Sequence, residues 1–218
     1  MKIYLLFIPL CFLTAIASGQ NQIRISGGLL STNTTVSEYD RGMNYFYYDS
    51  VTLDSRIISP AVNIDVDIDL GKQFFFNTGI SYSTKGISRI NYAKADYWYS
   101  ARQEYIGLKI NLKYHYKFNS EKFGIYISAG GKADYTVGGP TSAEIAILEG
   151  AEYLRAFGTF KQIDFSLLTN LGISYKLGPG DIILESNFQN GLSDIFEDQF
   201  IVGRTFSIGA QIGYSIYL

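Results

Sequence analysis

The chain contains a single histidine, His115, so any mechanism that needs an imidazole base must use it. His115 stands between Lys113 and Lys117 in the segment "KYHYK", and we expect it to face the interior of the fold as a hydrogen-bonded structural residue. The sequence has no phosphate-binding glycine loop, zinc-ligand spacing or nucleophile elbow, and "GPGD" and "VGGP" are turn signals. We therefore predict that the protein is not an enzyme and has no catalytic residue, metal site or cofactor.

The only cysteine, Cys11, lies in the N-terminal segment "MKIYLLFIPLCFLTAIASGQ". One early lysine, an apolar run and a group of small residues form the layout of a secretory signal peptide. The apolar run is shorter than the roughly 20 residues that a membrane-spanning helix needs, which argues against a membrane anchor. We predict a signal peptide over residues 1–19, with cleavage between Gly19 and Gln20. The mature chain then has no thiol, which excludes disulfides, thiolate metal sites and cysteine nucleophiles.

Two segments have an aromatic density that is unusual for solvated loops, "MNYFYYDS" and "NYAKADYWYS". Tyrosine and tryptophan provide large contact areas at low entropic cost and are enriched at recognition surfaces. One interpretation is an outward-facing patch that binds a protein or a glycan. The alternative is that these residues extend a barrel wall and lie at the membrane interface. The residues concerned are Tyr45, Phe46, Tyr47, Tyr48, Tyr97, Trp98 and Tyr99.

The elements that must position these residues show a period of two. In the last fifteen residues, "RTFSIGAQIGYSIYL", apolar side chains alternate with small or polar ones up to Leu218. Strict alternation indicates a β-strand with one apolar and one polar face. Eight segments have this pattern, and they cover residues 22–29, 62–70, 74–85, 105–118, 123–137, 163–177, 182–192 and 204–218.

The connections between these segments alternate strictly between short and long. The short ones are the turn-forming "GKQ", "NSEK" and "GPGD". The long ones run from about Ser31 to Ile57, Gly86 to Glu104, Gly138 to Gln162 and Ser193 to Gly203. This alternation predicts an up-and-down meander with tight turns at one end and extended loops at the other. The third long connection contains "SAEIAILEGAEYL", whose helix-forming composition suggests a helix that caps the barrel mouth.

The residues of the polar face indicate whether lipid or water surrounds the strands. It carries many charged residues together with Gly and Ser, while large aromatic residues lie toward the ends of the apolar face, as a membrane barrel requires. A soluble lipocalin-like barrel, with its apolar face turned inward, is the alternative. No strand edge can remain unpaired in hydrocarbon, so the terminal strand must close on the first. We predict an all-β protein, a single-domain, eight-stranded, antiparallel up-and-down transmembrane β-barrel over residues 20–218.

Eight strands enclose a space that side chains just fill, so the interior charges should form ion pairs rather than line a channel. We expect Lys176 and Glu185 to pair across the "GPGD" turn, and Lys85 and Lys117 to share the polar face. A conducting pore is the alternative. The predicted interior charge network consists of Arg24, Asp65, Asp67, Asp69, Lys109, Lys113, Lys132, Asp134, Lys176 and Glu185.

Several segments resemble known outer-membrane proteins. "QIGYSIYL" resembles the C-terminal insertion signal of outer-membrane barrels at Gln211, Gly213, Ile216 and Leu218, although Leu218 stands where the family usually has an aromatic residue. "NTGISYSTKG", "YIGLKINLKYHYKF", "ISAGGKADYTVGG" and "ESNFQNGLSDIF" resemble successive blocks of the PorT-like outer-membrane β-barrels of Bacteroidota-type bacteria. The resemblance implies an eight-stranded barrel that the barrel-assembly machinery inserts into the outer membrane. It implies no activity, although some relatives assist a protein-secretion system.

Composition agrees with this class of protein. Charged residues make up 17% of the chain, below the roughly 25% usual for soluble domains. The net charge of −2 provides no basic field, which excludes nucleic acid as a partner. We predict an outer-membrane protein with a non-enzymatic structural or interaction role. Its expected partners are outer-membrane lipid, the assembly machinery and a protein or glycan at the external loops. The alternatives are a secretion-system accessory and a narrow pore.

Overall fold

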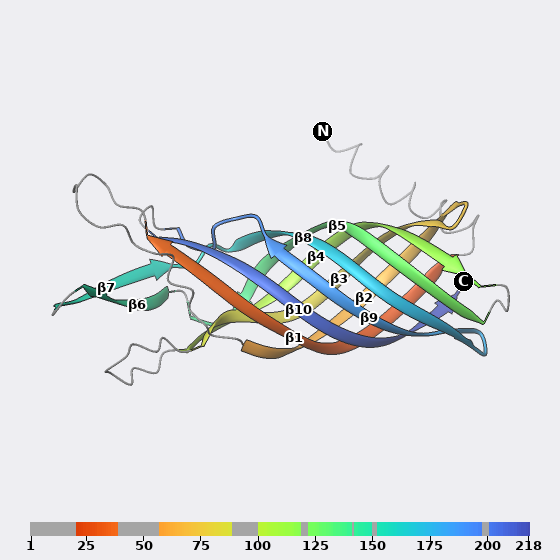
Figure 1. The fold of residues 1–218 in the computed structure, drawn as a ribbon, viewed down its shortest axis with the longest axis horizontal. Helices are drawn as coiled ribbons and strands as arrows, with labels where there is room; N and C mark the ends of the chain where they lie inside the picture. The colour runs from red at the N-terminus through yellow and green to blue at the C-terminus, as the bar shows by residue number, and fades with distance from the viewer. Residues whose placement is uncertain are drawn as a thin grey trace.

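The computed structural model describes residues 21–38, 57–88, 100–118, 122–140, 142–149, 152–197 and 201–218. Eight of its strands form a closed antiparallel barrel in the order β1-β10-β9-β8-β5-β4-β3-β2, and β6 and β7 form a separate hairpin (Figure 1). No helix in the described part of the chain is long and apolar enough to cross a bilayer. The barrel strands are β1 (Gln22–Glu38), β2 (Ile57–Gly71), β3 (Phe74–Ser88), β4 (Ser100–Lys117), β5 (Phe123–Gly138), β8 (Ile163–Leu177), β9 (Gly180–Gly191) and β10 (Ile201–Tyr217).

The barrel closes where the two ends of the chain meet. Strands β1 and β10 pair over their full length, from Gln22 opposite Tyr217 to Glu38 opposite Ile201. The backbone N–H of Leu218 also donates to the carbonyl oxygen of Asn21 at 2.9 Å. Each other barrel strand pairs with its neighbours along the chain, except that β5 pairs with β8 past the hairpin. The predicted eight-stranded up-and-down barrel is therefore confirmed.

The two faces of the wall have opposite chemistry. On β2, Ile64 is 55% exposed on the outside, whereas the neighbouring Asp65 is fully buried. The same alternation runs along β3, where Ile80 is 58% exposed and Asn77 is 1% exposed. Water-soluble monomers rarely expose a continuous apolar surface of this extent, whereas a transmembrane barrel turns such a surface toward lipid. The aromatic side therefore faces outward, and the lipocalin-like alternative is wrong.

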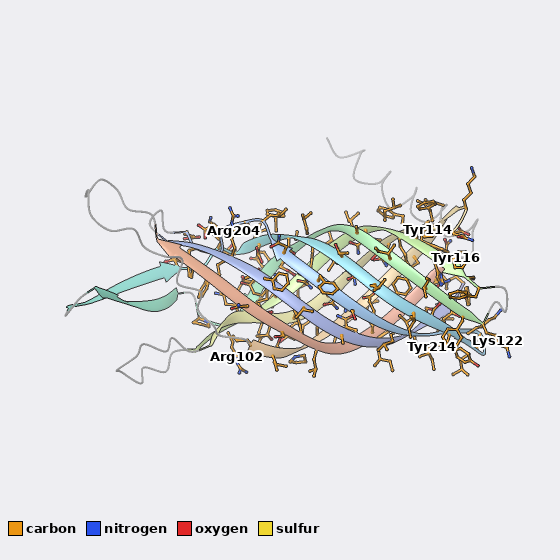
Figure 2. The ribbon with its side chains drawn as sticks, viewed as in Figure 1. Arg102, Tyr114, Tyr116, Lys122, Arg204 and Tyr214 are labelled. Atoms are coloured by element: carbon orange, nitrogen blue, oxygen red, sulfur yellow. The ribbon has the colours of Figure 1, made fainter. Side chains whose placement is uncertain are left out.

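The two ends of the barrel differ, as the connections predicted. The C-terminus and the β2–β3 and β8–β9 turns lie at one end, and the β6–β7 hairpin projects from the other (Figure 1). Outward-facing Tyr114, Tyr116 and Tyr214 lie near the turn end, and Arg102 and Arg204 lie toward the loop end (Figure 2). Transmembrane barrels of this type have short periplasmic turns and longer extracellular loops. The hairpin therefore marks the extracellular end.

The structure differs from the sequence-based expectation at the loop end. Strand β1 continues to Glu38 and β4 begins at Ser100, so these strands rise above the point where loops were predicted. The third long connection is not helical, because it forms β6 (Ser142–Glu149) and β7 (Glu152–Thr159), which pair along their whole length. Its Ala, Glu and Leu content favours a helix, but the isoleucine, phenylalanine and tyrosine residues favour an extended pair. The helix prediction was therefore wrong.

Candidate functional site

Arg24 lies at the centre of a buried charge cluster, which we call the central cluster. Its Nη2 is 2.6 Å from Asp65 Oδ2, and its Nη1 is 2.8 Å from Glu185 Oε2. Nη1 also donates to the hydroxyl of Tyr126 at 3.0 Å, and that hydroxyl donates to Glu185 at 2.8 Å. Lys109 Nζ approaches the other oxygen of Asp65 at 2.8 Å. Side chains from four strands besides β1 thus gather around one guanidinium, which fixes its orientation.

A glycine makes room for the tyrosine in this cluster. Tyr126 projects from β5 toward β8, where Gly172 stands on the inward face. A Cβ atom built at Gly172 would overlap the ring of Tyr126. The absence of a side chain at this position therefore lets the Tyr126 hydroxyl reach Arg24 and Glu185.

A second set of contacts continues the central cluster toward the turn end. Lys113 Nζ is 2.6 Å from Asp67 Oδ2, and the amide nitrogen of Asn77 donates to Asp67 Oδ1 at 2.6 Å. Asn111 in turn donates to the carbonyl oxygen of the Asn77 side chain at 3.0 Å. The ammonium group of Lys113 also lies 4.5 Å from the ring centroid of Tyr126, which adds a cation–π contact. Both oxygens of the Asp67 carboxylate are therefore satisfied.

A separate cluster lies nearer the loop end, and we call it the upper cluster. Lys85 Nζ is 2.7 Å from Asp134 Oδ2 and 2.8 Å from Asp164 Oδ2. Lys132 Nζ is 2.9 Å from the second oxygen of Asp134. The hydroxyl of Ser193, just after β9, donates to Asp164 Oδ1 at 2.6 Å. The upper cluster thus joins the barrel wall to the start of the fourth long connection.

The buried charges in the two clusters balance. Removing one partner of a buried pair leaves an uncompensated charge at a cost of about 3–5 kcal/mol, so an interior of this kind requires matched charges. Asp181 is also buried, and the hydroxyl of Tyr217 donates to it at 2.6 Å. The cations of the clusters are Arg24, Lys85, Lys109, Lys113 and Lys132, and the carboxylates are Asp65, Asp67, Asp134, Asp164 and Glu185.

A small cavity of about 10 Å³ adjoins the charged groups in mid-barrel. Three amide oxygens that border it, Asn170 Oδ1, Asn187 Oδ1 and Gln189 Oε1, are buried and have no hydrogen-bond partner among the described residues. A volume of this size holds about one water molecule, and such a water would donate to two of these oxygens. The cavity is lined by Asn63, Lys109, Lys132, Leu168, Asn170, Glu185, Asn187, Gln189 and Gln211.

An apolar cap that the sequence analysis missed lies at the extracellular end of the barrel. Phe196 is fully buried and stacks on Phe160 with 5.1 Å between ring centroids. The backbone N–H of Ile195 donates to the carbonyl oxygen of Gly203 at 2.9 Å, and that of Lys161 donates to the carbonyl oxygen of Ile195 at 2.8 Å. The segment thereby continues the wall above the end of β9. The available signal was an adjacent Ile-Phe pair inside the otherwise polar "SDIFEDQ".

His115 lies inside the barrel near the turn end, as predicted. Its Nε2 is 2.9 Å from the hydroxyl of Ser174, and its ring packs edge-on against Tyr126 at 5.9 Å. Nδ1 has no hydrogen-bond partner among the described residues, so no carboxylate of this part of the chain orients the ring. Nucleophilic catalysis by a serine needs a base that a third group holds in place. The pair is therefore arranged as packed interior residues.

Comparison with known proteins identifies the family. The family model described as "Outer membrane protein beta-barrel domain" matches residues 19–197, which is most of the chain. The chain belongs to this family. A search of curated proteins found no match.

The fold of this chain is similar to solved structures of outer-membrane barrels. OprG from Pseudomonas aeruginosa is 10% identical, with 91% of this chain and 97% of that chain covered and a TM-score of 0.52, which supports the fold. Neisserial surface protein A is 10% identical over 92% of this chain and 98% of that chain, with a TM-score of 0.47. Ail of Yersinia pestis, solved with the heparin analogue sucrose octasulfate, is 12% identical over 91% and 100%, with a TM-score of 0.40. With the family match, the fold makes the protein an outer-membrane β-barrel.

Two members of the predicted charge network lie outside the clusters of this outer-membrane barrel. Lys176 is exposed and stands opposite Asp181, whereas Glu185 stands opposite Gly172, four residues deeper. Four residues of strand correspond to roughly 13 Å, so Lys176 and Glu185 do not pair. Asp69 is half-buried at the turn end, where it accepts a hydrogen bond from the backbone N–H of Gly71 at 2.7 Å. Both residues follow the inward alternation, but they lie at the mouth, where water solvates them.

The structure describes some of the remaining predicted site residues and not others. Gln211 is buried and accepts hydrogen bonds from Asn63 and Ser26, whereas Ile216 on β10 and Leu218 just after it are exposed. A Cβ atom at Gly213 would meet the carbonyl oxygen of Ile25. The aromatic patch (Tyr45, Phe46, Tyr47, Tyr48, Tyr97, Trp98 and Tyr99), the signal peptide and the Gly19–Gln20 cleavage site lie outside the described residues.

Proposed function

We propose that the protein is a non-enzymatic, closed outer-membrane barrel that acts through contacts made at its extracellular end. The observation that carries this proposal is the filled interior, where five buried cations pair with five carboxylates. Side chains that are ion-paired and hydrogen-bonded in this way rigidify a scaffold. The strands and the β6–β7 hairpin that rise at the loop end provide the surface that such a scaffold presents.

The loop residues indicate the chemistry of the contact. The seven aromatic residues of the two loop segments offer flat, amphipathic surfaces that suit a protein or a glycan. The heparin analogue in the Ail structure is a ligand of that protein, and the proposal for this chain rests on its own loop residues.

Serine substitution tests the contact. The purified barrel is applied to an array of surface glycans and to extracellular proteins, with a variant in which residues 45–48 and 97–99 are serine. A variant with Tyr114 and Tyr116 changed to serine at the opposite end is the matched control. We expect binding to be lost in the loop variant and kept in the control. Equal binding by all three proteins would contradict the proposal.

A narrow pore is the second candidate, and the mid-barrel cavity is the observation that favours it. Its lining by Lys109, Lys132 and Glu185 is polar enough to be hydrated. Single-channel recording in planar bilayers separates the two functions. A closed scaffold gives no discrete current steps, whereas a pore gives steps of constant size that scale with salt concentration.

Three finer proposals rest on the sequence. A PorT-like accessory role in protein secretion predicts that deleting the gene lowers secretion of cargo proteins. Removal of residues 1–19 predicts a mature N-terminus at Gln20 by mass spectrometry, and the start of the family match at residue 19 supports that boundary. Recognition of Gln211, Gly213, Ile216 and Leu218 by the assembly machinery predicts slower membrane insertion when the last strand is altered.

A further inference from the structure

Exposed lysines gather at the short-turn end of the barrel. Lys72 lies in the β2–β3 turn, Lys122 just before β5, and Lys176 at the end of β8. We call these three residues the lysine rim. None of them forms an ion pair with a described residue. Lys117 differs, because its ammonium group lies 5.5 Å from the ring centroid of Tyr217 at the mouth. The lysine rim is therefore a set of unneutralised charges on the periplasmic side.

The lysine rim adjoins the outer aromatic residues of the wall. Lys122 directly precedes Phe123, and Lys176 directly follows Tyr175; the rings of Phe123 and Tyr175 contact each other at 5.2 Å. The backbone N–H of Lys176 donates to the carbonyl oxygen of Lys122 at 2.8 Å, so the two lysines lie side by side at the end of β8 and just before β5. Aromatic residues of this kind lie at the depth of lipid headgroups. Lys122 and Lys176 follow the inward alternation, so they lie at the rim of the barrel one residue beyond the aromatic pair. Their long exposed side chains extend past the end of the wall toward the depth of the headgroups.

Lys72 occupies a backbone conformation that a lysine does not favour. Its φ angle is +51°, in the left-handed region, and it lies between Gly71 at +82° and Gln73 at +71°. Glycine, asparagine and aspartate are the residues preferred at such turn positions. A lysine is thus present at a site where its backbone is strained. Strained residues that persist are concentrated at functional positions.

We propose that the lysine rim binds the phosphate groups of anionic phospholipids in the periplasmic leaflet of the outer membrane. Lysine is a compact point charge with three donors, which suits the phosphate of a mobile headgroup. Asp69, the carboxylate three residues before Lys72, accepts the backbone N–H of Gly71 and forms no ion pair with the rim. A basic residue at an anionic membrane surface strengthens association by about fivefold. The rim thus supplies a lipid contact that is independent of the loop end.

Lipid selectivity in vesicles tests this proposal. The barrel is folded into phosphatidylcholine vesicles, and the association of spin-labelled phosphatidylglycerol at the protein surface is compared with that of spin-labelled phosphatidylcholine. The test variant combines Lys72→Asn, Lys122→Gln and Lys176→Gln, because asparagine tolerates the left-handed conformation of the turn. The matched control is Arg102→Gln with Arg204→Gln, which removes two exposed cations at the opposite end. All proteins must show the heat-modifiable band of a folded barrel.

The expected result is a several-fold preference for phosphatidylglycerol that falls close to one in the test variant and persists in the control. If the test variant does not fold, Lys122→Gln with Lys176→Gln is expected to lose most of the preference. An unchanged preference in the lysine variants, or its loss in the control, overturns the proposal. Loss of the phosphatidylglycerol preference on addition of millimolar free phosphate also overturns the proposal. So does a wild-type barrel that shows no lipid preference and binds an acidic periplasmic protein instead.

Discussion

Arg24 shows how single residues hold this barrel together. In a soluble protein its position would be filled by an apolar side chain, but here the apolar side chains are on the outside and the interior consists of paired charges. Asp65, Glu185 and the hydroxyl of Tyr126 surround its guanidinium within 3.0 Å. A planar, always charged group that donates in several directions suits this centre better than a lysine. The specificity of the interior therefore depends on which strand presents each partner.

Arg24→Met is expected to lower the free energy of unfolding by about 3–5 kcal/mol, because it leaves Glu185 without a cation in a buried site. Lys176→Met is the matched control, and we expect it to change stability by less than about 0.5 kcal/mol because Lys176 is exposed. Urea titration in zwitterionic vesicles, followed by the loss of the heat-modifiable folded band, measures both. Equal losses would show that Lys176 belongs to the network after all.

For single residues, the sequence predicts which face of the wall a side chain lies on better than it predicts the residue with which that side chain pairs. Alternation correctly placed Asp65, Lys109 and Glu185 inside, because a period of two decides the face. It could not exclude Lys176 and Asp69, because burial also depends on how far along the strand a residue lies. The ion pairs depend on the register of strands that are distant in sequence, which a single sequence does not reveal.

The apolar cap acts at the scale of elements. Strand β9 ends at Gly191, well below the tops of its neighbours, and the following segment folds back to continue the wall. Asp194 fixes the bend, since its Oδ1 accepts the backbone N–H groups of Phe196 at 3.1 Å and Gly203 at 2.7 Å. Asp194 therefore holds Phe196 and Gly203 together at the extracellular end of the wall.

Phe196→Ala is expected to lower the free energy of unfolding by about 3–5 kcal/mol, since it empties a fully buried site. Phe206→Ala, on the lipid-facing wall, should cost only about 1 kcal/mol. Chemical denaturation in vesicles gives the two values. If the cap is also the extracellular seal, Phe196→Ala should admit current in planar bilayers where wild type does not. An unchanged current would assign the seal to the charge clusters alone.

Lys72→Gly is expected to raise stability by about 1 kcal/mol, because glycine adopts a φ of +51° without strain. The same change at Lys122, where the φ angle is not positive, should give no gain. Thermal midpoints in zwitterionic detergent, where lipid charge plays no part, compare the two. A Lys72→Gly barrel that is less stable than wild type would show that the turn tolerates lysine without cost.

The elements themselves were largely predictable, and the exceptions have physical causes. Tight turns such as "GPGD" and strict alternation located all eight barrel strands. The hairpin of β6 and β7 was predicted as a helix because its Ala, Glu and Leu residues favour a helix, whereas the segment pairs with itself as two strands. The cap was missed because a buried loop segment has no periodicity, and its burial depends on Gly203, which leaves room for the ring of Phe196.

At the scale of the whole molecule, the barrel and the β6–β7 hairpin are two distinct sheets. Strands β6 and β7 pair only with each other among the described elements, while Thr159 accepts a hydrogen bond from the cap at Glu197. The hairpin is thus joined to the described wall by the end of β7 and not by strand pairing.

Replacing residues 142–157 by a short glycine-containing turn is expected to leave the free energy of unfolding within about 1 kcal/mol of wild type, since loop length has a weak effect on closure entropy. Heat-modifiable gel migration and urea midpoints measure this. Extending the deletion to Lys161 removes the cap contacts and should destabilise the barrel. A barrel lost in the shorter deletion would show that the hairpin supports the wall.

The seam between β1 and β10 has a consequence for how the protein reaches its native state. It joins Gln22 to Tyr217, a separation of 195 residues along the chain, and no shorter route closes the cylinder. Pairings this distant in sequence form slowly, because the intervening chain must be ordered first. Until that moment the growing sheet has two unpaired edges of seventeen residues each, which invite pairing with other chains. The chain is therefore most prone to aggregation before the seam forms, and closure of the last strand onto the first ends that exposure.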